Sequence, residues 1–274
     1  MIQFFPSLIG GLAYMLCGPI ASYVSPGHDG KLFVSALLPL ALLLLVRGVR
    51  DGRPWAWGLF ALTIGLGVLS PHPQLLQYLL LTVGAFAIHL AFSEHPTGRI
   101  ERRVAVRRLL LALGGVAVGF LIGAAQYWPV LEYVSWSPRT GGKGWEHAVS
   151  YSLPIEEMVN FYLPQFTGIL DSYWGRNGIH FHSEYLGASV MLLAGAAFGA
   201  GSRRSFKWFW LGTLVVSLLW ALGGSTPFYR LVYALVPGTK FFRAPSTMLY
   251  VVAFSVCVLV ALGVEGILER RLER

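Results

Sequence analysis

The sequence predicts an all-α protein, a polytopic bundle of about eight transmembrane helices forming a single transmembrane domain over residues 1–274. Two observations lead to this fold class. Of the 274 residues, 55% are hydrophobic and only 12% are charged, whereas a soluble domain carries charge on about a quarter of its residues. The apolar residues also gather in runs that approach the roughly 20 residues a spanning helix needs. A bilayer is therefore the expected solvent for most of the chain.

Eight apolar runs define the expected helices in chain order. The runs 55–70 and 75–92 are separated only by the turn Pro71–Gln74, so this pair is interpreted as either two spans or a re-entrant hairpin. The first run lacks the basic region of a signal peptide and starts abruptly, which suggests a fragment of a longer protein. The expected spans are 4–24, 32–47, 55–70, 75–92, 109–134, 185–201, 208–222 and 245–267.

Basic residues predict the sidedness of these spans. Four clusters hold 14 of the 21 Lys and Arg residues. Threading the spans in order places all four on one side, which the positive-inside rule makes cytoplasmic, together with both termini. The net charge of +8 does not indicate nucleic acid as a partner, because the charges form short clusters between apolar runs. The clusters are Arg47–Arg53, Arg99–Arg108, Arg203–Lys207 and Arg270–Arg274.

The opposite, extracytoplasmic side collects histidines, acids and aromatic residues, mostly in the loop 135–184. Within it, Ser152–Glu157 predicts the start of a short interfacial helix, because proline suits a first turn and carboxylates favour a helix N-terminus. That helix is expected to stop before Pro164. The stretch Thr167–Glu184 is interpreted as an ordered loop. This side of the chain is where a functional site is expected.

A compact group in that loop combines an acid, two aromatic rings and a base: Asp171, Tyr173, Trp174 and Arg176. Sugar chemistry at a membrane surface needs a carboxylate to accept a hydroxyl proton, and it benefits from a flat ring and a guanidinium for phosphate. The alternative is a loop anchored by interfacial aromatic residues, which are enriched there in any case. Both interpretations stay open.

His180 and His182 form a candidate metal site with Glu184. Alternating residues of an extended segment share one face, so these three side chains suit a divalent cation. The competing interpretation is that they are interfacial hydrogen-bonding residues. Whether a cofactor is required is left open.

Five further residues, in three regions of the chain, are candidates for ligand binding or charge pairing. Arg243 follows Phe241 and Phe242 at the start of the last span, where it suits a lipid-linked phosphate or ordinary headgroups. His72 and Gln74 occupy the tight outer turn, where such residues commonly satisfy backbone groups. Glu132, near the outer end of its span, needs a partner, and Arg139 is the expected one.

Several short motifs follow one another along nearly the whole chain: Gly27-His28, Leu38–Leu40, His72–Gln74, Ser150–Pro154, Leu163–Gly168, Tyr173–Gly175, Glu184–Gly187, Phe242–Ser246 and Gly263–Glu265. In this order they resemble the bacterial YfhO-like membrane protein family. Pro71 stands where the family has glycine, and the family's acidic N-terminal loop has no counterpart. The chain therefore looks like the central portion of such a protein.

The resemblance implies a GT-C-like fold in the bacterial cytoplasmic membrane and transfer of a sugar from a polyprenyl-phosphate carrier to a cell-envelope acceptor. Membrane lipids and the lipid-linked sugar are then the partners. Asp171 or Glu184 would assist catalysis, with the remaining candidates binding substrate: His72, Gln74, Arg139, Tyr173, Trp174, Arg176 and Arg243. A transporter or flippase and a non-catalytic scaffold are the alternatives. A transporter needs ionisable residues at mid-membrane, and these are scarce here.

Overall fold

The computed structural model of the chain consists of helices and connections, with no β-strand among the residues that it describes. The described residues fall into two compact units. We call Asp29–Gly141 the central unit, and Met1–His28 with Gly142–Arg274 the terminal unit. The prediction of one transmembrane domain stays a prediction. The structure describes residues 3–24, 26–93, 98–137, 143–168, 170–177, 183–199 and 203–272.

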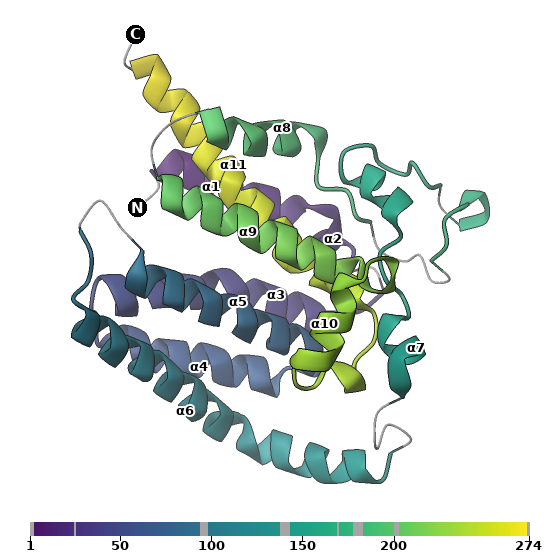
Figure 1. Cartoon of the computed structure of the whole chain (residues 1–274), viewed down its shortest axis with the longest axis horizontal. Coiled ribbons are helices and arrows are strands. Elements are labelled where there is room, and N and C mark those ends of the chain that lie inside the picture. The colour runs from purple at the N-terminus through teal and green to yellow at the C-terminus, as the bar shows by residue number, and fades with distance from the viewer. Residues whose placement is uncertain are drawn as a thin grey trace. The chain divides into compact units, whose positions relative to one another are not determined.

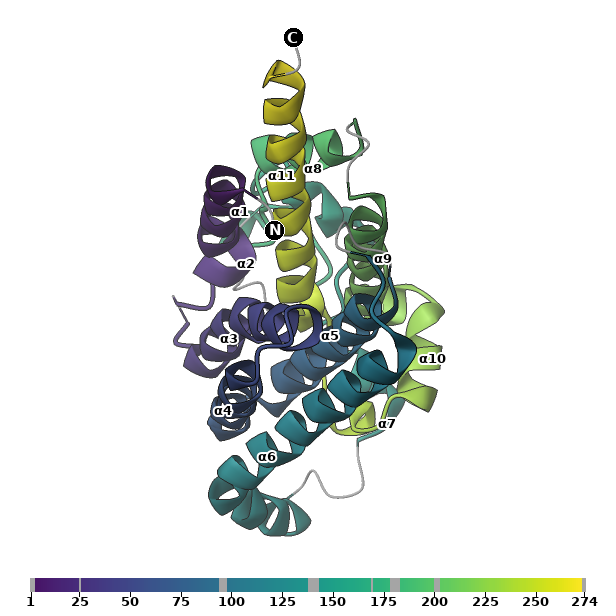
Figure 2. The ribbon, with the colours of Figure 1, turned by 90° about the vertical axis from the view of Figure 1, so that its left-hand side faces the viewer.

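The central unit contains four helices that lie side by side (Figures 1 and 2). They are α3 (Asp29–Leu45), α4 (Trp55–Leu69), α5 (Pro73–Phe92) and α6 (Arg102–Ser135). α3 continues as a π-helix, Val46–Arg50. α3 packs on both α4 and α5, and α4 packs along α6.

Glycines allow α4 and α6 to approach closely. A Cβ atom on Gly119 of α6 would lie 2.7 Å from the Cβ of Ile64 and 2.9 Å from the carbonyl oxygen of Ala61, both on α4. Because these distances are shorter than a normal carbon contact, only glycine permits the observed separation. Small residues are the usual means of tight helix pairing in membranes, where apolar side chains gain little from leaving lipid.

Two arginines join the connections at one end of the central unit. The Arg50 guanidinium donates to the carbonyl oxygen of Ser93 at 2.8 Å, and that of Arg108 donates to the carbonyl oxygen of Val49 at 2.7 Å. Carbonyl groups at helix C-termini lack partners within the helix, and a cation there also favours the helix dipole. The basic clusters therefore hold helix ends in place, and the turn Pro71–Gln74 lies at the other end of α4 and α5.

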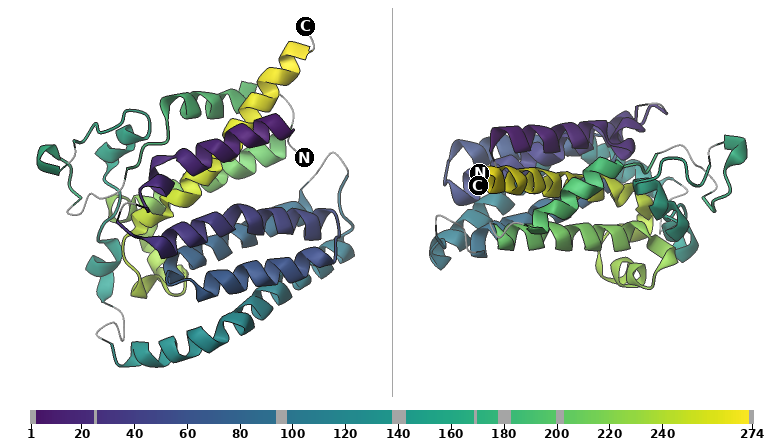
Figure 3. Two further views of the ribbon diagram at one scale, coloured as in Figure 1. Left: turned by 180° about the vertical axis from the view of Figure 1, so that it is seen from behind. Right: turned by 90° about the horizontal axis from the view of Figure 1, so that it is seen from above.

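The terminal unit is built around α11 (Leu249–Leu272), which packs against three other helices (Figure 3). The 3₁₀ turn Pro245–Met248 leads into α11. Most of the α11 side chains between Leu249 and Leu262 are buried. The surrounding helices are α1 (Phe4–Leu16), α8 (Ala188–Ala196) and α9 (Arg204–Ala221), and shorter ones are α2 (Gly18–Ala21), α7 (Gly144–Val149) and α10 (Phe228–Leu235).

An ion pair between a partly buried arginine and a buried glutamate closes one end of the terminal unit. Arg203, which precedes α9, donates to the carboxylate of Glu265 on α11 through Nε at 2.7 Å and through a terminal nitrogen at 3.1 Å. The backbone N–H of Gln3, at the start of α1, donates to the same carboxylate at 3.0 Å. Glu265 thus connects α1, α9 and α11 through three hydrogen bonds.

The all-helical prediction is confirmed for the described residues, and each expected span overlaps at least one helix. By length and composition, the described part of the chain contains four helices able to cross a membrane: Asp29–Arg50, Pro73–Phe92, Arg102–Ser135 and Pro245–Arg270. Shorter apolar helices occupy Phe4–Leu16, Trp55–Leu69 and Ala188–Gly199. The count of eight spans and the GT-C-like arrangement stay predictions.

The first expected span, 4–24, is interrupted in the structure. Cys17 is extended, with φ −67° and ψ 149°, and separates α1 from α2. Pro19 in the first turn of α2 has no N–H group to continue the α1 hydrogen-bond pattern. The N–H of Gly18 donates instead to the carbonyl oxygen of Tyr185 at 2.7 Å, so a contact distant in sequence stabilises the break.

Candidate functional site

The polar segment that follows α7 lies at one end of the terminal unit. Leu153 donates from its backbone N–H to the carbonyl oxygen of Ala221 at the end of α9, and Ala244 donates to Ser150 just before α11 begins. The ion pair of Arg203 with Glu265 lies at the other ends of these two helices. Within this unit, the Arg203–Glu265 ion pair and the polar segment therefore lie at opposite ends, and the sidedness of the chain in a membrane stays a prediction.

A 3₁₀ helix, Ile155–Phe161, occupies the stretch for which a short interfacial helix is predicted, between Pro154 and Pro164. Proline at 154 fits the position before a first turn, and no α-helical hydrogen-bond pattern develops in these seven residues. Its place at a membrane interface stays a prediction. Its residues carry the carboxyl groups described next.

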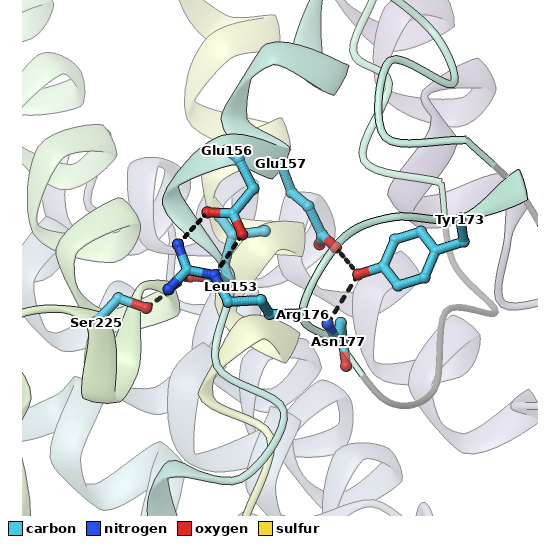
Figure 4. A network of polar contacts seen from close by, with 7 residues as sticks. All are labelled: Leu153, Glu156, Glu157, Tyr173, Arg176, Asn177 and Ser225. Atoms are coloured by element: carbon cyan, nitrogen blue, oxygen red, sulfur yellow. Dashed lines mark hydrogen bonds and ion pairs between the residues drawn. The ribbon is translucent and has the colours of Figure 1, made fainter.

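A buried carboxyl group lies on this helix. Glu157 is fully buried, and its carboxylate accepts a hydrogen bond from the hydroxyl group of Tyr173. The same hydroxyl oxygen accepts from the backbone N–H of Asn177 at 2.8 Å (Figure 4). Tyr173 therefore uses its hydroxyl group to fix the loop 170–177 against the 3₁₀ helix.

A second buried carboxyl group, Glu184, belongs to the same cluster and is 6% exposed. Asn160 hydrogen-bonds to the Glu184 carboxyl and donates to Thr167 Oγ1 at 2.9 Å. The N–H of Thr167 returns a bond to Asn160 Oδ1 at 3.3 Å. We call Glu157, Asn160, Thr167, Tyr173 and Glu184 the carboxyl cluster.

Burial changes the protonation of the carboxyl cluster. Loss of solvent, with the nearby charge of Glu157 as the second cause, raises the pKa of Glu184 to about 8. Burial also raises the pKa of Glu157, although the hydrogen bond from Tyr173 acts in the opposite direction. Burial and the bond to Glu157 raise the pKa of Tyr173, so its hydroxyl group stays a donor. At neutral pH Glu184 is therefore mostly protonated, and it becomes a proton acceptor only near pH 8.

Arg176, a predicted phosphate-binding residue, is engaged with a carboxylate. Its guanidinium donates to both oxygens of Glu156, at 2.7 and 2.9 Å (Figure 4). The side chain of Arg176 is 80% exposed, so the pair lies at the surface. The hydrogen bonds from Arg176 lower the pKa of Glu156. A phosphate at this position would have to displace a carboxylate.

Arg243 lies over an aromatic ring instead. Its guanidinium carbon is 5.4 Å from the ring centroid of Tyr151. Both Tyr151 and Ala244 have φ of 57°, in the left-handed region that costs non-glycine residues about 1 kcal/mol or more. The bond from Ala244 to the carbonyl oxygen of Ser150, at 2.9 Å, links the two strained residues. Strained backbone of this kind is enriched at functional sites.

Two more cations lie over rings near α7. The guanidinium of Arg230 is 6.0 Å from the ring of Trp145, and the ammonium of Lys240 is 5.8 Å from the ring of Tyr233. Trp145 itself packs edge-on against Tyr233, with ring centroids 5.4 Å apart. With Arg243 over Tyr151, these contacts form what we call the cation–ring surface. Cations over rings combine a flat apolar face with positive charge, which suits a sugar phosphate.

Other predicted residues of the loop lie outside the carboxyl cluster. Asp171 is exposed on the 3₁₀ turn Leu170–Ser172, with no hydrogen bond to the cluster among the described residues. Trp174 is largely exposed, its Nε1 donates to the carbonyl oxygen of Phe166 at 3.2 Å, and the two rings pack edge-on. Asp171 and Trp174 are therefore exposed at the surface, whereas Glu184 keeps only 6% of its surface exposed.

His72 and Gln74 belong to the central unit, where both take part in local structure. His72 Nδ1 accepts from the N–H of Leu75 at 3.3 Å and caps α5. Gln74 is buried, and its Nε2 donates to the hydroxyl oxygen of Tyr78 at 2.8 Å. These contacts match the backbone-satisfying alternative for His72.

Arg139, His180 and His182 lie outside the described residues, so the metal site and the pairing of Glu132 with Arg139 stay predictions. In the part of the chain that the structure describes, no three His, Cys, Asp or Glu side chains are grouped to hold a metal ion.

Sequence reasoning missed Glu157 and Asn160 as members of the carboxyl cluster. The available signal was an acid and an amide interleaved with Met158, Val159 and Phe161, which places polar groups among buried residues. That pattern by itself predicts only the start of a helix. Arg230 and Lys240 were also missed, because their ring partners are distant in sequence.

Over the residues that the structure describes, the chain is all-helical and has four helices long and apolar enough to cross a membrane. The chain matches no protein-family model, no curated protein and no solved structure. The resemblance to the YfhO-like family therefore depends on the sequence motifs alone.

Proposed function

We propose that the chain is a YfhO-like protein of the bacterial cytoplasmic membrane that transfers a sugar from a polyprenyl-phosphate donor to an acceptor of the cell envelope, in this form or within a longer protein. One observation carries the proposal. The segment 150–157 contains both Tyr151, whose ring lies under the guanidinium of Arg243, and the buried Glu157. Glu157 belongs to the carboxyl cluster with Glu184, so a cation that suits phosphate lies a few residues from this cluster. The chain from Tyr151 to Glu157 can span at most about 20 Å.

In the proposed reaction, Arg243 binds the donor phosphate and the Tyr151 ring lies against the sugar. Ionised Glu184 accepts the proton of the acceptor hydroxyl group, and that oxygen forms a bond to the anomeric carbon. The bond from the anomeric carbon to the phosphate oxygen breaks, and polyprenyl phosphate leaves with the electron pair. No proton is needed on the leaving group, because phosphate carries the charge. Asp171 is the competing proton acceptor, since it is exposed.

The proposed topology has eight spans, both termini in the cytoplasm and the loop 135–184 outside. The separation of basic and polar ends within each unit supports it. Single cysteines at positions 174 and 103 test it in intact cells with a membrane-impermeant thiol reagent, in a background without Cys17 and Cys257. Labelling at 174 with protection at 103 is expected, and the reverse pattern would invert the orientation.

Transfer from a labelled polyprenyl-phosphate sugar, catalysed by the purified protein in detergent, tests the activity. Removing a general base costs about 10²- to 10⁴-fold in rate, so Glu184→Gln is expected to lose at least about a hundredfold. Asp51→Asn is the matched control, because it also neutralises one carboxylate but lies in a surface pair with Arg47.

The outcomes distinguish the two acids. Loss in Asp171→Ala with full activity in Glu184→Gln would assign the proton transfer to Asp171. Full activity in both variants would remove both carboxylates from the reaction. Unchanged donor affinity in Arg243→Gln would contradict the assignment of the phosphate site.

A further inference from the structure

α10 exposes apolar side chains at the polar end of the terminal unit. Its buried face consists of Tyr229 and Val232. On its other face, Leu231 is 59% exposed and Leu235 is 76% exposed, and Phe241 on the following 3₁₀ turn is half exposed. A short helix with one packed face and one exposed apolar face requires an apolar environment outside the protein.

Two cations lie among these apolar side chains. Arg230 follows Tyr229 on α10, and Lys240 precedes Phe241; both are exposed. Among the described residues, neither forms an ion pair with a carboxylate. Each lies instead over a ring of the cation–ring surface, Arg230 over Trp145 and Lys240 over Tyr233. These positive charges therefore have no protein counter-ion there.

The rings position the cations without neutralising them. Trp145 contacts Tyr229 at 6.0 Å and Tyr233 at 5.4 Å between ring centroids, so α7 and α10 share one aromatic cluster. Aromatic rings with a polar edge favour the boundary between acyl chains and headgroups, and basic side chains there attract acidic lipids. A short helix with an exposed apolar face and basic side chains beside it is typical of an interfacial element.

We propose that α10 and the turn Thr239–Phe241 form a binding site for phospholipids with net negative headgroups. Arg230 and Lys240 bind the lipid phosphate, and Leu231, Leu235 and Phe241 contact the acyl chains. Positive charge without a counter-ion among the described residues, beside apolar side chains, complements a lipid that has an acidic headgroup and acyl chains. The site does not depend on sugar transfer, and it involves neither Glu184 nor Arg243.

Lipid binding to the purified full chain, measured by native mass spectrometry, tests the site. The protein is titrated with phosphatidylglycerol or phosphatidylcholine. Each basic residue near an acidic lipid surface contributes about fivefold in affinity, so the double variant Arg230→Gln/Lys240→Gln is expected to bind phosphatidylglycerol roughly thirtyfold more weakly. Phosphatidylcholine binding is expected to change little.

The matched control is Arg102→Gln/Arg103→Gln, which removes the same charge from exposed positions on α6. An equal loss in the control would mean that net charge, and not this site, governs binding, and would overturn the proposal. Competition by excess inorganic phosphate would identify a free-anion site and would also overturn it. Loss of phosphatidylglycerol binding in the Arg230→Gln/Lys240→Gln variant, with the control variant binding as the wild type does, would support the lipid site whether or not the proposed enzyme activity is correct.

Discussion

Replacing Glu184 with glutamine is expected to stabilise the chain at alkaline pH. The pKa of this carboxyl is raised to about 8 by burial, with the charge of Glu157 as second cause, from an ordinary value of 4.5. Between these values the folded chain keeps a proton that the unfolded chain has lost. Stability is therefore unaffected by Glu184 below about pH 4.5, and it falls as the pH rises toward 8.

The size of this effect follows from the two pKa values. One pKa unit corresponds to about 1.4 kcal/mol, so the interval from 4.5 to about 8 amounts to roughly 5 kcal/mol at alkaline pH. Glutamine has the shape of glutamate, stays neutral at every pH and can still accept the hydrogen bond from Asn160. Glu184→Gln should therefore keep at alkaline pH the stability that the wild-type chain loses.

Thermal unfolding of the purified chain in an uncharged detergent, from about pH 5 to about pH 9, measures the difference. The wild-type and Glu184→Gln curves are expected to coincide at the acid end and to separate as the pH rises. Glu146→Gln is the control, since Glu146 is an exposed carboxyl in the same unit. Parallel curves for wild type and Glu184→Gln over the whole range would refute the assignment of a buried, protonated carboxyl.

The remaining predictions concern packing, charge pairing and catalysis. Glu265→Ala should lower the free energy of unfolding by about 3 kcal/mol, because it leaves a partly buried guanidinium unpaired. Asp51→Ala, at a surface pair, should lower it by at most about 0.5 kcal/mol. Similar losses in the two variants would contradict the structural role of the Arg203–Glu265 pair. Gly119→Ala should destabilise the chain by about 1–3 kcal/mol through overpacking of α4 on α6. Gly114 faces open space, so Gly114→Ala should be neutral or stabilising. Denaturant unfolding measures both variants. If Glu184 is the proton acceptor, sugar transfer should rise with pH up to about 8, and a flat profile would exclude it.

The positions of the longer apolar helices could be predicted from the sequence, because long apolar runs determine them locally, whereas α7 and α10 lie in stretches expected to be loops. The break at Cys17 could not, since it depends on a bond between Gly18 and Tyr185 that joins distant parts of the chain. The number of spans is also not fixed by hydropathy alone. α4 has 15 residues, about 22 Å of helix, which is less than the hydrocarbon thickness of a typical bilayer.

The sequence predicts which region of the chain contains the candidate site, but not which residues form it. Composition indicated that acids and aromatic residues gather in the loop 135–184. Burial determines which of the acids have a shifted pKa, and burial depends on tertiary packing. Asp171 and Glu184 therefore looked alike in sequence, but one is exposed and the other is buried. In the same way, Arg176 looked available for phosphate until its pairing with Glu156 was seen.

The arginines at the basic end of the central unit have a consequence for evolution. Arg50 and Arg108 reach backbone carbonyl groups of other segments, and lysine, with one nitrogen, would preserve the charge but not the forked geometry. Arg102 and Arg103 are exposed, and the proposed topology requires only that they stay positive. Homologous chains should therefore exchange arginine and lysine freely at 102 and 103 but retain arginine at 50 and 108.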